Sequence, residues 1–242
     1  MLTKTKGIVF RAIKYGDTSL ICDIYTLDLG LRSYIFSGVR KSRTRVSAGL
    51  LQPMSLLDLV VYNKEGKDLN RVKEIKVLHP YQQLPYDVRR SSVGLFLIEV
   101  ARKSIREAHT NPALFRYLLE RFILLDTLDT GLGHFHLHTM VGLTRFLGFM
   151  PGGTFEPESS TFDLREGLFL RSGYIDPLYR MDIPESEALF QLLGLPDESI
   201  SDYHIKVEIR DRLLEKLIKY YTYHVERFGE LKSLEVLRAV LH

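Results

Sequence analysis

A run of closely spaced cations is the part of this sequence whose residue types and spacing most directly suggest chemistry. The segment Arg40-Lys41-Ser42-Arg43-Thr44-Arg45 is basic at four of its positions. Lysine and arginine neutralise phosphate groups, so such a run is typical of nucleic-acid binding. The candidate ligands are Arg40, Lys41, Arg43 and Arg45. A solvated charged loop without a ligand would have the same composition, and both interpretations remain open at this point.

Charge is also uneven along the rest of the chain. The first 80 residues hold 14 lysines and arginines against 7 aspartates and glutamates, and the other 162 hold 19 against 23. The formal net charge of +3 therefore combines +7 in the first part with −4 in the second. A basic N-terminal part is the electrostatic pattern of a nucleic-acid binder. Further candidate cations recur on the strands that we predict there, namely Arg11, Lys14, Arg32, Arg71 and Lys73.

Aromatic residues are interleaved with these cations, at Tyr15, Tyr25, Tyr34 and Phe36. Cationic grooves with aromatic platforms are how proteins bind single strands without sequence preference. Periodicity does not show which of these rings face inward, so no stacking role is assigned to them.

Three alternating histidines invite a metal interpretation. On a helix, His134 and His138 share a face while His136 points elsewhere, and no further ligand is fixed by the sequence. We therefore predict surface or helix-start histidines and no metal. A metal-dependent hydrolase is kept as an alternative that rests on these histidines alone.

Catalytic motifs are missing from the sequence. It contains no Walker A, HExxH or GxSxG pattern, so we expect no enzyme activity. The neighbouring carboxylates Asp126 and Asp129 are expected to be solvated. Tyr220 and Tyr221 are expected to pack in a helical core rather than stack on bases.

Composition restricts the class of protein. Cys22 is the only cysteine, which excludes an internal disulfide and a cysteine-based zinc site. No signal peptide and no apolar run long enough to span a membrane is present, so we expect a cytoplasmic protein.

The first 80 residues predict five strands separated by turns, over 7–15, 19–26, 31–37, 54–63 and 69–78. A long connection between the third and fourth strands favours an OB-fold barrel over an SH3-like barrel. In the fifth strand we expect the apolar residues Leu69, Val72, Ile75 and Val77 to face inward, with Val72 out of phase with the others. We expect Arg71, Lys73 and Lys76 to lie near solvent.

Helical periodicity begins after residue 80. The predicted helices cover about 86–107, 112–131, 134–147, 183–193 and 202–227, with a last one after Ser233. Asn111 is expected to cap the second, and Asp182 and Glu185 have capping-box spacing. A small hairpin is predicted from 161–164 and 168–171. The sequence thus predicts an α+β protein with an OB-fold DNA-binding domain over 1–80 and an α-helical domain over 81–242, with an insertion at about 151–181.

Several motifs resemble the RecO family of bacterial DNA repair and recombination mediators. They are Gly16-Asp17-Thr18-Ser19-Leu20-Ile21, Tyr25-Thr26, Gly30-Leu31, Gly38-Val39-Arg40-Lys41-Ser42-Arg43, Leu51-Gln52-Pro53, and Leu143-Thr144-Arg145-Phe146-Leu147-Gly148-Phe149-Met150-Pro151. The resemblance covers nearly the whole chain.

This resemblance implies an N-terminal OB-fold, binding to single- and double-stranded DNA, strand annealing and loading of RecA onto coated single strands, as in the RecFOR pathway. It implies RecR and the acidic C-terminal tail of single-strand-binding protein as partners, in the bacterial cytoplasm and with the nucleoid. Helical cations that could rim a pocket for that tail are Arg102, Lys103, Arg106 and Arg116. The other class of function kept open is an interaction module whose basic head docks an acidic protein without a DNA role.

One departure from the family concerns zinc. Many members carry a four-cysteine zinc site after the proline that corresponds to Pro151, whereas residues 152–174 contain no cysteine here. We expect no zinc, and we expect the insertion to be held by packing of Phe155, Phe162, Phe169 and Tyr174.

Overall fold

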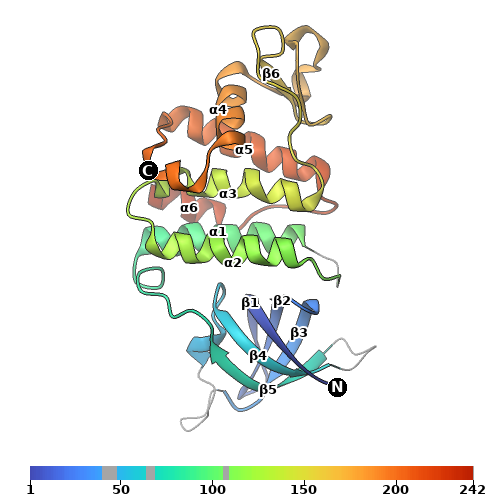
Figure 1. The fold of residues 1–242 in the computed structure, drawn as a ribbon, viewed down its shortest axis with the longest axis vertical. Coiled ribbons are helices and arrows are strands. Elements are labelled where there is room, and N and C mark those ends of the chain that lie inside the picture. The colour runs from blue at the N-terminus through green and yellow to red at the C-terminus, as the bar shows by residue number, and fades with distance from the viewer. Residues whose placement is uncertain (40–47, 64–68, 106–108, 242) are drawn as a thin grey trace. The chain divides into compact units, whose positions relative to one another are not determined.

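The protein is described by a computed structural model covering residues 1–39, 48–63, 69–105 and 109–241. It forms two compact units, Met1–Thr127 and Leu128–His242 (Figure 1). The first unit holds a β-barrel and two helices, and the second holds helices and a small sheet. The predicted fold class is confirmed. The domain boundary that we predict after residue 80 stays a prediction.

The barrel of the first unit contains five strands and is closed in the order β1-β2-β3-β5-β4. The bounds are β1 Leu2–Tyr15, β2 Ser19–Thr26, β3 Gly30–Phe36, β4 Leu56–Tyr62 and β5 Leu69–Val77. All pairs are antiparallel except β3 with β5. A short 3-10 helix, η1 Ala48–Leu51, lies in the connection between β3 and β4.

The barrel core follows from alternation along the strands, because successive side chains point to opposite faces. Cys22, Ile24 and Tyr34 are buried in it together with Leu59. Cys22 is therefore a small core hydrophobe, and burial raises its pKa to about 12. Gly7 leaves no room for a side chain, since an added Cβ would lie 2.6 Å from Cγ2 of Ile24 and 2.9 Å from Cδ1 of Leu59.

The inward set predicted for β5 is partly wrong. Leu69 and Val77 are exposed, and Asn70 is buried opposite Tyr34. For Leu69 the reason is a bulge in the pairing of β4 with β5, where Val61 pairs with Val72 and Val60 with Glu74. Lys73 is the additional residue, and it changes which alternate positions face inward along the strand. Val77 pairs with the core residue Leu57, as an inward position does, but it is the last residue of β5 and stays exposed.

Two helices complete the first unit, α1 Val88–Ser104 and α2 Pro112–Thr127. Side chains on one part of the outer barrel surface are buried although they do not face the barrel core, among them Ile8, Phe10 and Tyr25. The Tyr25 ring contacts Phe115 of α2, with ring centroids 6.0 Å apart, and its hydroxyl donates to the carbonyl oxygen of Asn111. Asn111 caps α2 as predicted, because its Oδ1 accepts from the backbone N–H of Leu114.

Asp126 does not lie in solvent, contrary to expectation. Its side chain is 1% exposed and accepts the backbone N–H groups of Gln82, Gln83 and Leu84 in the connector before α1. Burial alone would raise the pKa of Asp126, but these hydrogen bonds and nearby His79 lower it below its usual value. The carboxylate is a structural element of the first unit.

The second unit is built around α3 Leu132–Leu147, with α4 Ile183–Gly194, α5 Val207–His224 and α6 Leu234–Leu241. Its three-stranded sheet has the order β7-β6-β8, with β6 Thr161–Asp163, β7 Leu168–Leu170 and β8 Arg180–Met181. The predicted hairpin is confirmed, and β8 was not predicted. Tyr220 and Tyr221 are core residues as predicted.

The predicted packing of the insertion is correct for its phenylalanines and wrong for Tyr174. The Phe169 ring lies 5.0 Å from that of Phe162 and 6.2 Å from that of Phe155, between centroids. Tyr174 is 79% exposed. The capping box expected for α4 does not form, because Glu185 is buried and bonds to Arg212 while Asp182 provides no side-chain cap.

The three alternating histidines are buried, so the expectation of surface histidines is wrong, although His134 lies in the first turn of α3, the other position that we predicted. His134 Nε2 lies 2.7 Å from the carbonyl oxygen of Ile200, and His138 Nε2 lies 2.9 Å from that of Leu195. Burial lowers the pKa of His136 to about 3, so its ring is neutral at physiological pH. In the part of the chain that the structure describes, no cluster of three or more histidine, cysteine or acidic residues is arranged to hold a metal.

None of the helices within the described residues combines the length and apolar character that crossing a bilayer requires.

Candidate nucleic-acid interface

The cation run that suggested nucleic-acid binding lies outside the described residues. This applies to Arg40, Lys41, Arg43 and Arg45, and also to Arg106 among the helical cations. Their roles stay predictions. The described part of the candidate interface therefore consists of side chains on the barrel strands.

Two of the predicted strand cations have acidic neighbours. Arg11 lies on the outer surface of β1, with its Nε 3.3 Å from Oδ2 of Asp23 on β2. Asp23 also accepts the hydroxyl of Ser33 on β3, at 2.7 Å. Lys73 lies 3.6 Å from Glu74 and is exposed. Both ion pairs are solvent-accessible, so they reduce the local positive charge but contribute little to stability.

Arg32 is placed differently from the other predicted cations. It pairs with Ile24, which is a core residue, and it is only half-exposed. Burial raises the pKa of Tyr34 to about 12, although the charge of Arg32 acts to lower it. Arg32 therefore occupies an inward register position rather than the open outer surface. Lys14 is exposed near the end of β1.

Arg71 lies on the outer surface of β5, between Ile35 of β3 and Tyr62 of β4 in the register. It is exposed, and no acidic group among the described residues lies within 4.0 Å of its guanidinium. Of the strand cations that we predicted as phosphate ligands, it has the position best suited to that role.

Two lysines that were not predicted as ligands lie on the same side of the barrel. Lys4 and Lys6 are two residues apart on β1 and therefore point outward together. Lys6 is opposite Asp58 of β4, and Asp58 is opposite Lys76 of β5. Lys4, Lys6 and Lys76 are exposed, and none has an acidic partner within 4.0 Å in the described part of the chain. Phosphates could reach all three.

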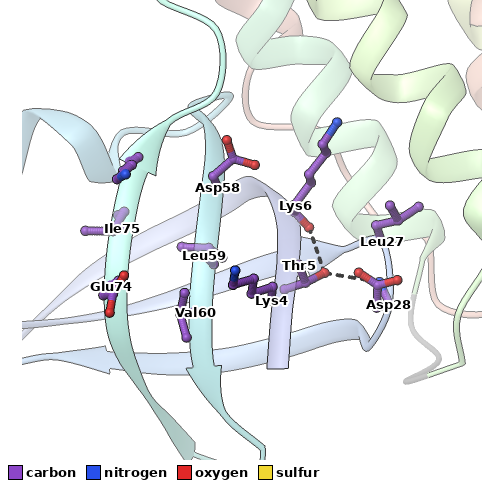
Figure 2. Close-up of a pocket in the computed structure, with 11 residues that line it drawn as sticks. Lys4, Thr5, Lys6, Leu27, Asp28, Asp58, Leu59, Val60, Glu74 and Ile75 are labelled. Carbon is purple, nitrogen blue, oxygen red and sulfur yellow. Dashed lines mark hydrogen bonds between the residues drawn. The ribbon is translucent and has the colours of Figure 1, made fainter. Parts of the chain in front are cut away.

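A hollow of about 440 Å³ lies between these lysines. Figure 2 shows β5, β4 and β1 side by side, with the turn that contains Leu27 and Asp28 beyond β1. Its apolar lining residues outside the barrel core are Val60 and Leu27. The charged residues lining it are Lys4, Lys6, Lys76, Asp28, Asp58 and Glu74. Because both signs of charge are present, the hollow itself does not define a phosphate site, and Lys4, Lys6 and Lys76 are its cationic side chains.

Burial decides which aromatic rings on the barrel are accessible. Tyr25, Tyr34 and Phe36 are at most 5% exposed and belong to packed cores, so they are unavailable for base stacking. Tyr15 is 55% exposed, and Tyr62, which was not singled out from the sequence, is 43% exposed. Alternation with buried Val61 is the signal that would have placed Tyr62 outside.

The helical cations do not form an evident peptide pocket. Arg102 and Lys103 are half-buried in the last turn of α1, and Arg116 is exposed, with its Nε donating to the carbonyl oxygen of Pro112. A hollow of about 560 Å³ in the first unit is lined by apolar residues such as Leu50, Pro53 and Leu95. Among the described residues, none of the helical cations lines it.

A closed OB-fold barrel with exposed cations on its outer surface, followed in the chain by an α-helical unit, is an architecture found among proteins that bind nucleic acids. Comparisons with known sequences give the particular family. Residues 1–81 match the profile described as "Recombination protein O N terminal" and residues 85–235 match "Recombination protein O C terminal". The chain belongs to the RecO family.

Individual relatives agree over the whole length. The chain is 34% identical over 244 residues to a protein of Bacteroides fragilis named "DNA repair protein RecO", with 98% of each chain covered. It is 35% identical to the protein of the same name from Flavobacterium psychrophilum, with 99% of each covered. The protein of that name from Christiangramia forsetii is 34% identical, again with 99% of each chain covered.

Proposed function

We propose that this protein is a DNA repair and recombination mediator that binds single- and double-stranded DNA through the outer surface of its barrel. The observation that carries this proposal is a group of exposed cations on a barrel of the RecO family, none of which has an acidic group within 4.0 Å among the described residues. They are Lys4, Lys6, Arg71 and Lys76. Such contacts bind phosphates regardless of sequence and depend strongly on salt.

Further activities follow from family membership alone. We propose that the protein anneals complementary strands and helps to load RecA onto coated single strands. Its proposed partners are RecR and the acidic tail of single-strand-binding protein. We also propose that it acts without enzymatic turnover and without a metal cofactor, in the cytoplasm and with the nucleoid.

Salt-titrated DNA binding by charge-matched variants tests the DNA-binding surface. The double variant Lys4→Gln/Lys6→Gln removes two cations from the barrel surface, and Lys206→Gln/Lys219→Gln removes two exposed cations from the second unit. For single strands, each lost phosphate contact flattens the slope of log affinity against log salt by about 0.7. We expect the barrel variant to flatten by up to about 1.4 and the control to keep the wild-type slope.

Two results would contradict this assignment. Equal slopes of log affinity against log salt in both double variants would show that Lys4 and Lys6 do not contact phosphates. A wild-type protein that binds an acidic peptide but neither form of DNA would instead support an interaction module that docks acidic proteins.

A further inference from the structure

A row of outward-facing side chains crosses all five strands of the barrel. Strand register places its members next to one another in the order Ile13, Ile21, Ile35, Arg71, Tyr62 and Leu2. Leu2, Tyr62 and Ile13 are 47%, 43% and 40% exposed. Arg71 is the one charged member of an otherwise apolar row.

Tyr62 has the most distinctive surroundings in this row. Its neighbours across the strands are Arg71 on β5 and Leu2 on β1, and such directly opposite residues have Cβ atoms about 4.5–5.5 Å apart. Within the described residues, no other aromatic ring packs on Tyr62 and no hydrogen bond holds its hydroxyl. The ring therefore contributes an accessible face beside a cation, without a role in the barrel core.

We propose that Tyr62 and Arg71 together bind one unpaired nucleotide of a single DNA strand. The base stacks on the Tyr62 ring beside Leu2, and the Arg71 guanidinium binds a phosphate of the same strand. This inference rests on the proposed DNA-binding function and adds the element that separates single strands from duplexes.

The selectivity has a physical basis in base stacking. An aromatic ring can stack on any base, because every base has a π-face, but in a duplex both faces are already covered by neighbouring base pairs. A ring on a strand surface therefore adds stacking free energy to the binding of an unpaired base and adds none to the binding of a duplex. Arg71 contacts phosphate, which both forms of DNA present, so it supports affinity without selecting between them.

The charge around the pair favours a nucleic acid as the occupant. Lys4 follows two residues after Leu2 on β1, and Lys73, whose charge is partly offset by Glu74, follows two residues after Arg71 on β5. Both lysines are exposed. An apolar row interrupted and flanked by cations is complementary to a strand that alternates flat bases with phosphates.

Tyr62→Leu tests the stacking contact, since leucine keeps apolar bulk on the strand surface and removes the ring. Affinities are measured by fluorescence anisotropy with oligothymidine and with a duplex of equal length. Stacking on one base amounts to about 5- to 150-fold in affinity, so we expect Tyr62→Leu to weaken single-strand binding by a factor in this range. Duplex affinity and the salt slope should stay at wild-type values.

Three further variants separate this effect from misfolding and from general loss of charge. Tyr62→Phe keeps the ring and should bind single strands as the wild type does. Tyr15→Leu removes the other exposed strand tyrosine, which pairs with Ser19 rather than with a cation, and should also have no effect. Arg71→Gln should weaken single strands and duplexes alike and flatten both salt slopes, by about 0.7 and 0.9 respectively.

A spectroscopic signal identifies stacking directly. A single strand that carries a fluorescent adenine analogue, whose emission falls when it stacks, should be quenched by the wild type and by Tyr62→Phe but not by Tyr62→Leu. If Tyr62→Leu weakens both forms of DNA equally, or weakens neither, this inference is overturned while the proposed function stands. If the wild type binds no DNA at all, the proposed function itself fails.

Discussion

Asp126, near the end of α2, accepts a hydrogen bond of 2.7 Å from the backbone N–H of Leu84 in the connector that leads from the barrel into α1. The same carboxylate accepts the N–H groups of Gln82 and Gln83. One buried carboxylate thus accepts hydrogen bonds from three consecutive backbone N–H groups in the segment between β5 and α1. Because buried donors are costly when left unpaired, the path of this connector depends on a single residue.

Replacement of Asp126 should destabilise the first unit. In Asp126→Ala the three backbone donors lose a charged acceptor, and we expect the free energy of unfolding to fall by about 3 kcal/mol. Urea denaturation monitored by circular dichroism measures the change. Exposed Asp129 is the matched control, and Asp129→Ala should change stability by less than about 0.5 kcal/mol. Equal losses of stability in Asp126→Ala and Asp129→Ala would contradict this role of Asp126.

The buried histidine His136 should make stability depend on pH. Burial, followed by the charges of Arg210 and His134, lowers its pKa from 6.5 to about 3. Between these values the unfolded chain binds a proton that the folded chain does not, so the stabilising contribution is complete above pH 6.5 and falls as the pH decreases toward 3. One such group gives a limiting slope of about 1.4 kcal/mol per pH unit.

His136→Gln should remove this linked proton. The free energy of unfolding, measured by urea denaturation across a series of pH values, should then decline less steeply on acidification than in the wild type. Exposed His109 provides the control, since His109→Gln should leave the steepness unchanged. A profile for His136→Gln parallel to that of the wild type would show that this ring does not carry the dependence.

Gly7 should tolerate no larger residue. The Cβ of Gly7→Ala would lie closer to Ile24 and Leu59 than van der Waals contact allows, so we expect a loss of about 1–3 kcal/mol from overpacking of the barrel. Gly173→Ala is the control, because nothing lies within 4 Å of the position of its added Cβ. Chemical denaturation of both variants compares them, and a fully stable Gly7→Ala would mean that the barrel core can expand.

The cation run should contribute to DNA affinity independently of the barrel surface. We expect the quadruple substitution to alanine of Arg40, Lys41, Arg43 and Arg45 to weaken binding. It should flatten the salt slope for single strands by up to about 0.7 for each lost contact. A quadruple variant with the wild-type slope would assign phosphate binding to the strands alone. Tight binding of an acidic partner by this variant, after loss of DNA affinity, would favour the protein-docking alternative.

Local alternation and turn chemistry were sufficient to predict much of the barrel. The predicted strand over 19–26 has the bounds of β2, because its core positions alternate without interruption between two turns. In β5 the alternation is broken by the bulge at Lys73, and a bulge is a property of the paired strands rather than of one sequence. This is why Leu69 was assigned to the wrong face.

The misassigned histidines have a different cause. Residues 134–141 of α3 are all buried, so the helix is enclosed on every side and shows no polar face in its sequence. Two of the imidazoles, His134 and His138, donate through Nε2 to the carbonyl oxygens of Ile200 and Leu195, which are about sixty positions away in the chain. Periodicity along one helix carries no information about such partners.

The surface lysines were missed for a simple reason. The first strand was predicted to start at Gly7, whereas β1 starts at Leu2, and Leu2, Lys4 and Lys6 are its outward positions. The predicted ligands were therefore the cations of the long connection and of the other strands, and these two lysines were not among them. For Tyr62, facing outward follows from alternation, but its position beside Arg71 depends on strand pairing and could not be read from the chain.

Closure of the barrel restricts how a partner peptide can bind. In the ring β1-β2-β3-β5-β4 every strand has a neighbour on both sides, so an extended peptide finds no free edge at which to add a sixth strand. The barrel can therefore recognise a partner peptide through side chains on its outer surface, but not by adding it as a strand. The small sheet differs, since β8 pairs only with β6 among the described residues, whereas β7 pairs with β6 and forms one further bridge from Leu168 to Gly152. Recognition through backbone hydrogen bonds would therefore have to use the second unit.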